Sequence, residues 1–189
     1  HSSIALNVRA DSDTEVYAEF GRTPARYERS TAPVTAAAGQ PVELVLDGLT
    51  ADSRYYYRVQ RRAPGSGSYA PGLEHTFVTQ RSPGSTFTFA AQGDSHPERA
   101  GNMFNSDLYV RTLRAVAAER PDFYITSGDD FSVDTLRTVN QATVTERYTI
   151  QVPYLSIVGQ SSPLFLVNGN HEQAARYLLD GSPNNVAVW

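Results

Sequence analysis

The sequence predicts a two-domain protein, in which an all-β domain over residues 1–80 precedes an α/β domain over residues 86–189. Before residue 80, short runs alternate between apolar and polar residues, which is the pattern of half-buried strands. From Thr86 onward, short apolar runs alternate with segments of helical periodicity, which favours a parallel sheet with helical crossovers. Residues 81–85, Arg-Ser-Pro-Gly-Ser, are expected to form a linker because Pro and Gly interrupt regular structure.

The amino-acid composition limits the partners and the metal ligands that this chain is expected to use. The formal charge of -4 is mild and the Arg residues do not form a stripe, so neither nucleic acid nor a membrane surface is implied as a partner. No apolar run approaches the roughly 18 residues of a transmembrane helix. The chain contains no Cys, which leaves His and oxygen ligands for any metal ion and fits either redox compartment.

Alternating runs predict the strands of the first domain. They are Ile4-Leu6-Val8, Val16-Ala18-Phe20, Val42-Leu44-Leu46, Tyr55-Tyr57-Val59 and a last strand over Thr76–Thr79. Turn-forming pieces rich in Gly, Pro, Asp and Ser separate them. Such short strands at regular spacing are typical of a β-sandwich.

One segment of this domain resembles the fibronectin type III pattern. Leu46-Asp47-Gly48-Leu49 comes a few residues before the Tyr-rich run Arg54–Val59, as a leucine precedes the tyrosine-corner strand in that family. The resemblance implies that Tyr55 is the corner tyrosine, whose hydroxyl bonds to upstream backbone. A generic β-sandwich with an ordinary Tyr-rich strand is the alternative.

Strands and helices are expected to alternate in the second domain. The predicted strands are Thr86–Ala91, Asp122–Thr126 and Leu164–Val167. The first helix contains Tyr109, Leu113 and Val116 at helical spacing, begins near a cap at Asn105 or Ser106, and ends before Pro121. A second helix is expected over Val144–Ile157, with a kink or a break at Pro153, and a short third helix over Glu172–Leu179.

Each of the three strands ends in glycine followed by polar residues that are good metal ligands. The segments are Gly93-Asp94-Ser95-His96, Ser127-Gly128-Asp129-Asp130 and Asn168-Gly169-Asn170-His171-Glu172. In open parallel sheets ligands bind outside the carboxyl ends of the strands. We therefore expect all three segments to line one pocket.

The residue types in this pocket indicate transition-metal chemistry. Asp94 and His96 lie two residues apart, and a carboxylate with an imidazole suits Zn, Mn, Fe, Ni or Co better than Mg or Ca. Asp129 has two oxygens and could bridge a pair of ions, while Asn170 would supply an amide oxygen to the second ion. His171 could instead donate to developing charge or protonate a leaving oxygen. Two such ions would serve phosphoryl displacement.

Together the three segments resemble the first three motifs of the calcineurin-like metallophosphoesterases. The motifs are Asp94-x-His96, Gly128-Asp129 and Gly169-Asn170-His171-Glu172, and the resemblance covers roughly residues 86–175. It implies that residues 86–189 form the first β-α-β-α-β half of an α/β domain of αββα type. The implied activity is dimetal-dependent hydrolysis of phosphate monoesters or diesters by a metal-bound hydroxide.

The resemblance also implies roles for the site residues. Asp94, His96 and Asp129 would hold the first of two divalent transition-metal ions, Asp129 and Asn170 the second, and His171 would act in catalysis. A fibronectin-like domain before such a fold also resembles the purple acid phosphatases. That branch has glycine in place of His96 and a tyrosine ligand in place of Ser132, so this chain is expected to be a non-purple relative.

Later family motifs are missing. The family pattern continues with a further histidine and a Gly-His-x-His motif, whereas this chain has only His1, His75, His96 and His171. We expect the chain alone to be inactive, to bind at most one ion weakly, and to need the C-terminal half of the same domain as its partner. An unpaired sheet edge and uncovered apolar surface should mark that missing half.

Two alternatives remain at this stage. One is a non-catalytic metal- or ligand-binding fragment, and the other is an extracellular adhesion or carbohydrate-binding module carried by the β-domain. The substrate within the class of small phosphate esters is left open, as is the compartment. Domain architecture alone favours a secreted or periplasmic location.

Overall fold

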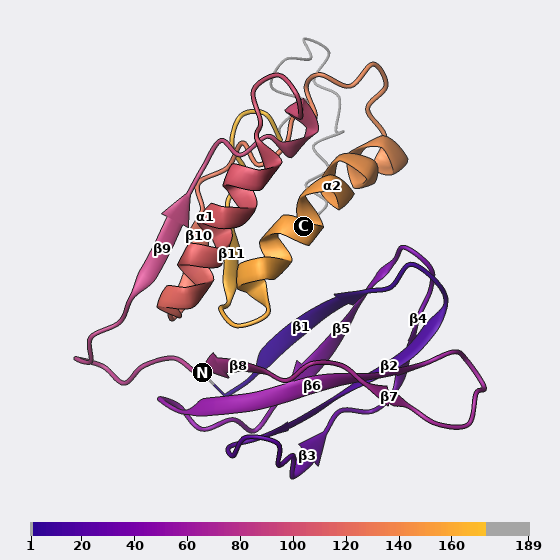
Figure 1. Cartoon of the computed structure of the whole chain (residues 1–189), viewed down its shortest axis with the longest axis vertical. Coiled ribbons are helices and arrows are strands. Elements are labelled where there is room, and N and C mark those ends of the chain that lie inside the picture. The colour runs from indigo at the N-terminus through magenta and orange to yellow at the C-terminus, as the bar shows by residue number, and fades with distance from the viewer. Residues whose placement is uncertain (1, 173–189) are drawn as a thin grey trace. The chain divides into compact units, whose positions relative to one another are not determined.

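The computed structural model describes residues 2–172. The chain divides into two compact units between Thr86 and Phe87 (Figure 1). Among residues 2–172, the regular elements of the first unit are all strands, and those of the second are three strands and the long helices. Within the described residues, no helix is both long enough and apolar enough to cross a bilayer.

The first unit consists of antiparallel sheets. Its strands are β1 (Ile4–Arg9), β2 (Thr14–Gly21), β3 (Arg29–Ser30), β4 (Val34–Ala36), β5 (Pro41–Leu46), β6 (Arg54–Arg62), β7 (Ala70–Pro71) and β8 (His75–Val78). Strands β1 and β5 form one sheet. Strands β2 and β6 form the centre of the other, with β3 and β4 paired to β2, and β7 and β8 paired to β6.

Inward-facing residues of both sheets form one core. The buried members are Val16, Ala18, Phe20, Leu44, Leu46, Leu49, Tyr55, Tyr57 and Phe77. Their alternation along β2, β5 and β6 confirms the strand periodicity in the sequence. The hydroxyl of Tyr55 accepts a hydrogen bond of 3.0 Å from the backbone N–H of Thr50, so the predicted bond to upstream backbone is also confirmed. Tyr55 stacks on Phe77 with ring centroids 5.6 Å apart.

The second unit has the predicted alternation of strands and helices. Its elements are β9 (Phe89–Gln92), the 3₁₀ turn η1 (Pro97–Arg99), α1 (Ser106–Glu119), β10 (Phe123–Thr126), α2 (Gln141–Gly159) and β11 (Leu164–Leu166). The sheet order is β11-β10-β9, and both strand pairs are parallel, as the sequence predicts.

Side-chain caps define where the helices start. Asn105 accepts a hydrogen bond of 3.0 Å from the N–H of Leu108, which confirms one of the two predicted caps of α1. At the start of α2, Asn140 and Thr143 bond each other's backbone N–H groups in a capping box.

Helix α2 contains the predicted span Val144–Ile157 and runs through Pro153, so of the two predicted effects of this proline, a kink or a break, the break does not occur. A proline inside a helix costs about 3 kcal/mol, because it removes one hydrogen bond and crowds the preceding turn. Burial of Leu155 and Val158 in the core beneath the helix offsets this cost. The predicted helix over Glu172–Leu179 extends beyond the described residues.

The two faces of the β9–β11 sheet differ in burial. Helices α1 and α2 cover one face, where Leu113, Tyr124 and Leu155 share a core. On the opposite face the rings of Phe89 and Phe123 stack, with centroids 5.3 Å apart. Phe89 and Phe165 are each 54% exposed. These rings form an exposed apolar surface on this face of the sheet.

Candidate metal centre

Backbone hydrogen bonds join the three loops that follow β9, β10 and β11. The N–H of Asp94 donates to the carbonyl of Gly128 at 3.0 Å. The N–H of His171 donates to Oδ1 of Asp129 at 2.9 Å, and the N–H of Val133 donates to the carbonyl of His171 at 2.8 Å. The carboxyl ends of the parallel strands thus meet in one connected site, as expected for this fold class.

The loops after β10 and β11 approach each other so closely that two positions, Gly128 and Gly169, have no room for a side chain. A Cβ at Gly128 would collide with the backbone of Gly169, and a Cβ at Gly169 would collide with Asp129. Gly128 also has φ 99°, a conformation that other residues rarely adopt. These positions need glycine for the second and third loops to touch.

Three predicted ligands have strained backbone. Asp94, His96 and Asp129 have φ of 55°, 44° and 56°, in the left-handed region. For residues other than glycine this conformation is uncommon and costs of the order of 1 kcal/mol or more. Six non-glycine residues within residues 2–172 have positive φ, and three of them are these predicted ligands. Such strain is concentrated at functional sites, so its clustering here supports a site.

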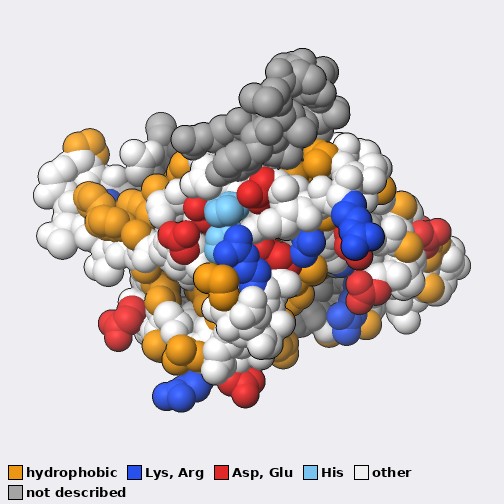
Figure 2. Space-filling model, turned by 90° about the horizontal axis from the view of Figure 1, so that it is seen from above, with side chains coloured by type: hydrophobic (Ala, Val, Ile, Leu, Met, Phe, Trp, Pro, Cys, Tyr) orange, Lys and Arg blue, Asp and Glu red, His pale blue; other side chains and the backbone are white. Residues whose placement is uncertain are grey.

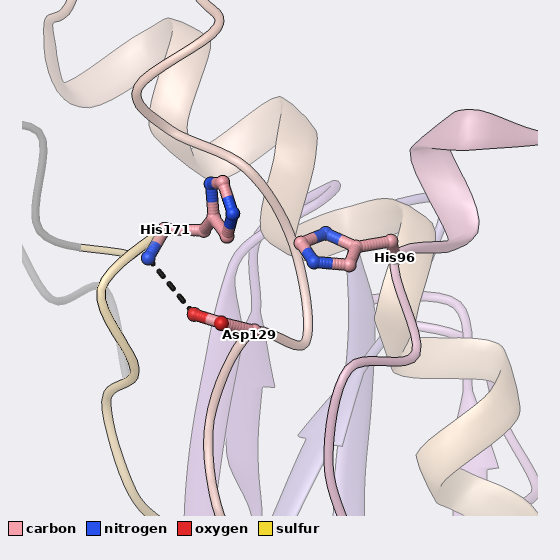
Figure 3. A group of neighbouring side chains, drawn as sticks. All are labelled: His96, Asp129 and His171. Atoms are coloured by element: carbon pink, nitrogen blue, oxygen red, sulfur yellow. Dashed lines mark hydrogen bonds between the residues drawn. The ribbon is translucent and has the colours of Figure 1, made fainter. Parts of the chain in front are cut away.

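His96, Asp129 and His171 form a compact group of possible metal ligands (Figure 3). One ligand atom from each lies within 4.8 Å of the others. The two imidazole rings meet edge to face, with centroids 4.9 Å apart. His96 is buried, while Asp129 and His171 are half-buried, so the group is open on one side.

The donor set of this group fits a transition-metal ion. Two imidazoles and a carboxylate are the ligands of many catalytic zinc sites, at about 2.0–2.2 Å from the ion. Ligand atoms in such a tetrahedral site lie roughly 3.4 Å apart, so small rotations of the side chains would close the group on one ion. Three protein ligands also leave a position for substrate or water.

Each histidine of the group is held through its Nδ1 atom by a carboxylate. Nδ1 of His96 lies 3.1 Å from Oε1 of Glu98, whose side chain is only 3% exposed. Nδ1 of His171 lies 2.9 Å from Oδ1 of Asp134. Carboxylates in this position orient a metal-binding imidazole and leave Nε2 for the ion. Glu98 and Asp134 were not predicted from the sequence, because acidic residues two and five positions after a motif residue carry no recognisable spacing signal.

Ser132 lies beside His96. Its Oγ is 3.2 Å from Nδ1 of His96, and it accepts a hydrogen bond of 2.8 Å from the guanidinium of Arg99. The backbone N–H of Ser132 donates to Glu98 at 2.9 Å. A small buried residue at this position leaves room for the imidazole of His96.

The side chain of Glu172 ties the second loop to the third. This residue is 3% exposed, and its carboxylate accepts hydrogen bonds from the backbone N–H groups of Asp129, Asp130, Phe131 and Gly169. A carboxylate that satisfies so many buried donors is a strong structural link. Glu172, the last residue of the third motif, therefore holds the second and third loops together beside the candidate site.

Asp130 is fully buried next to this link. It accepts hydrogen bonds from Oγ of Ser95 at 3.2 Å and Nε2 of Gln151 at 3.4 Å. Burial raises the pKa of the Asp130 carboxyl above its usual range. Asp130 therefore connects the first and second loops to helix α2 and does not cap a helix.

The structure brings together some of the sequence-predicted site residues. His96, Asp129 and His171 converge, and the group includes the histidine that was predicted to act in catalysis. Asp94 is exposed and lies outside the group, although its loop is joined to the second loop. Asn170 is half-buried on the third loop, directly before His171.

Comparison with solved structures relates the fold to a phosphatase. The chain matches the purple acid phosphatase PPD1 from yellow lupin (Lupinus luteus) seeds with a TM-score of 0.65 and 15% sequence identity. The match covers 91% of this chain and 34% of the lupin chain. No family model matches the sequence, and no curated protein matches it. The match supports a metallophosphoesterase-like fold.

Proposed function

We propose that this chain is part of a metal-dependent hydrolase of phosphate esters, and that residues 86–189 supply the first half of its catalytic domain. The observation that carries the proposal is the convergence of His96, Asp129 and His171 on loops that follow three parallel strands. The fold match to a phosphatase supports the same class. The first 80 residues are proposed to be a fibronectin type III-like domain, supported by the Tyr55 hydrogen bond.

His96 and Asp129 would hold a divalent transition-metal ion, with Asp94 and Asn170 as further oxygen donors on the same loops. Bound divalent ions would activate a water molecule and polarise the phosphoryl oxygens. Glu98 would keep the imidazole of His96 oriented, because its carboxylate accepts from Nδ1–H and is itself fixed by the N–H of Ser132.

Of the three clustered residues, His96 and Asp129 are assigned to the metal, and His171 is assigned to the leaving group in place of the ligand role that its position also allows. The carboxylate of Asp134 lies 2.9 Å from the Nδ1 of His171 and would hold the orientation of the ring. A ring N–H of His171 would then donate a hydrogen bond to the oxygen on which negative charge develops as the ester bond breaks. Its backbone N–H, held by Oδ1 of Asp129, fixes the loop so that the ring stays beside the metal ligands.

The activity is assigned to a longer protein. The chain spans 34% of the length of the matched phosphatase. A further segment that covers the Phe89–Phe165 face and adds metal ligands would complete the domain.

The test is hydrolysis of p-nitrophenyl phosphate and bis(p-nitrophenyl) phosphate by the natural full-length protein with added Zn²⁺, Mn²⁺ or Fe²⁺. Asp129→Ala should lower kcat/KM by on the order of a thousandfold, because the residue contacts the metal at the reacting centre. Asp107→Ala, an exposed position in the first turn of α1, is the matched control and should keep full activity. Normal turnover by the Asp129→Ala enzyme would refute the proposal.

A further inference from the structure

A cleft with a volume of about 500 Å³ opens next to the candidate metal centre. Its wall is formed by η1 and the loop that follows it, by the loop after β10, and by helix α2. The residues that matter here are Glu98, Arg99, Asn102, Met103, Thr135 and Arg147.

The cleft wall is connected directly to both histidines. Glu98 contacts Nδ1 of His96 at 3.1 Å. Arg99 donates to Oγ of Ser132 at 2.8 Å, and that oxygen lies 3.2 Å from the same imidazole nitrogen. On the opposite wall, Thr135 directly follows Asp134, which is bonded to His171. A molecule with one end at the metal ligands could therefore place its other end in the cleft.

The cleft presents positive charge. The carboxylate of Glu98 is directed to His96 and Ser132, and its side chain is only 3% exposed. The side chain of Arg99 is 24% exposed, but its Nε lies 3.7 Å from Oε1 of Glu98, so these two charges are paired. The side chain of Arg147 forms no hydrogen bond or ion pair with another of residues 2–172, so the unpaired positive charge of the cleft comes from Arg147. Figure 2 shows basic side chains beside the histidines on this surface, and they are Arg because the chain contains no Lys.

We propose that this cleft binds a second anionic group of the substrate, so that the preferred substrate is a phosphate ester whose alcohol part carries another phosphate or a carboxylate. This inference rests on the proposed hydrolase function. It names the substrate class of that same site.

The lining suits such a group. A guanidinium offers paired N–H donors that match the oxygens of a phosphate or carboxylate. The side chain of Arg147 can turn to a ligand without losing a bond to any of residues 2–172, whereas Arg99 is already held by Ser132 and Glu98. Exposed Asn102 adds a neutral donor, and exposed Met103 offers apolar surface for the carbon part of the molecule.

The first test measures binding of inorganic pyrophosphate to this chain in EDTA, by calorimetry and by amide chemical shifts. Arg147→Gln should weaken binding about tenfold, the loss expected for one charge-assisted contact. Arg111→Gln removes an exposed Arg from α1 and should leave the affinity unchanged. Shifts in wild type should centre on Asn102, Thr135 and Arg147. Equal affinity in Arg147→Gln and wild type, or an equal loss in Arg111→Gln, would overturn the proposal.

The second test uses the full-length protein with two phosphate monoesters that differ only in a second anionic group. Wild type should favour the ester with the second anion, and Arg147→Gln should reduce this preference in kcat/KM about tenfold. An unchanged preference would overturn the substrate assignment. Loss of pyrophosphate binding in Arg147→Gln combined with no hydrolysis by any form would refute the hydrolase function and leave the anion-binding cleft standing.

Discussion

The two units differ in how far their aromatic side chains are buried. In the first unit, Phe20, Tyr55 and Phe77 are buried between two sheets, each at 4% exposure or less. In the second unit, Phe89 and Phe165 lie on the face of the β9–β11 sheet opposite the helices and are 54% exposed. A sheet that is apolar on both faces needs a layer on each side. The first unit supplies its own layers, whereas the part of the second unit within residues 87–172 supplies only the helical one.

The two units also differ in where their polar side chains lie. The first unit has exposed ion pairs such as Arg29–Asp47 at 2.8 Å, which contribute little to stability. The second unit buries Asp130, Glu172 and Gln151 around the candidate metal centre. Burying such groups is costly unless they are hydrogen-bonded. In the second unit, part of the buried interior therefore consists of polar side chains whose hydrogen bonds hold the loops of the candidate site in place.

The largest expected effect comes from a matched pair of phenylalanine substitutions. Phe77→Ala should lower the free energy of unfolding of the first unit by about 3–5 kcal/mol, because it removes a buried ring and leaves a cavity. Phe89→Ala should cost less than about 1 kcal/mol, because the ring is already half in solvent. Urea unfolding followed separately for each unit distinguishes the two. Similar losses for both variants would show that the Phe89 face is covered.

A smaller effect is expected at the link between the loops. Glu172→Ala should destabilise the site by about 3 kcal/mol, because several buried N–H donors lose a charged acceptor. Amide hydrogen exchange at Asp129, Phe131 and Gly169 should become faster, while exchange in β2 and β6 should not change. Glu146→Ala, at an exposed position of α2, is the control. Unchanged protection at the three loop amides would contradict the role given to Glu172.

The smallest effect concerns the tyrosine hydrogen bond of the first unit. Tyr55→Phe should cost about 1 kcal/mol, because the N–H of Thr50 loses its acceptor while the ring packing on Phe77 is kept. Tyr56→Phe, the neighbour on the other face of β6, should be within about 0.5 kcal/mol of wild type. Equal stability of the Tyr55→Phe variant and wild type would remove the main support for a fibronectin type III-like corner.

Periodicity in the sequence was sufficient to predict most elements of both units. The alternation in β2, β5 and β6 and the helical spacing around Leu113 depend on local burial, which sequence patterns record directly. The pattern predicted helix on both sides of Pro153 but left open whether the proline breaks it, and α2 continues without a break. This continuity depends on tertiary burial of Leu155 and Val158, which outweighs the local preference of proline.

The site was predictable as a set of loops but less so as a set of contacts. Gly128 and Gly169 mark the close approach of two loops, and His96 and Asp129 are the kind of ligand expected there. Glu98 and Asp134 could not be found, because their role depends on which way two imidazole rings turn. Sequence spacing does not contain that information.

The most direct test of the metal centre is a Co²⁺ titration of this chain, followed by the absorption bands of the bound ion. We predict one weakly bound ion per chain, with affinity reduced at least tenfold in His96→Ala through loss of a ligand. His75→Ala, which removes a histidine of the first unit, should bind as wild type does. Binding that is unaffected by His96→Ala, or that falls equally in His75→Ala, would contradict the assignment of the three loops as a metal site.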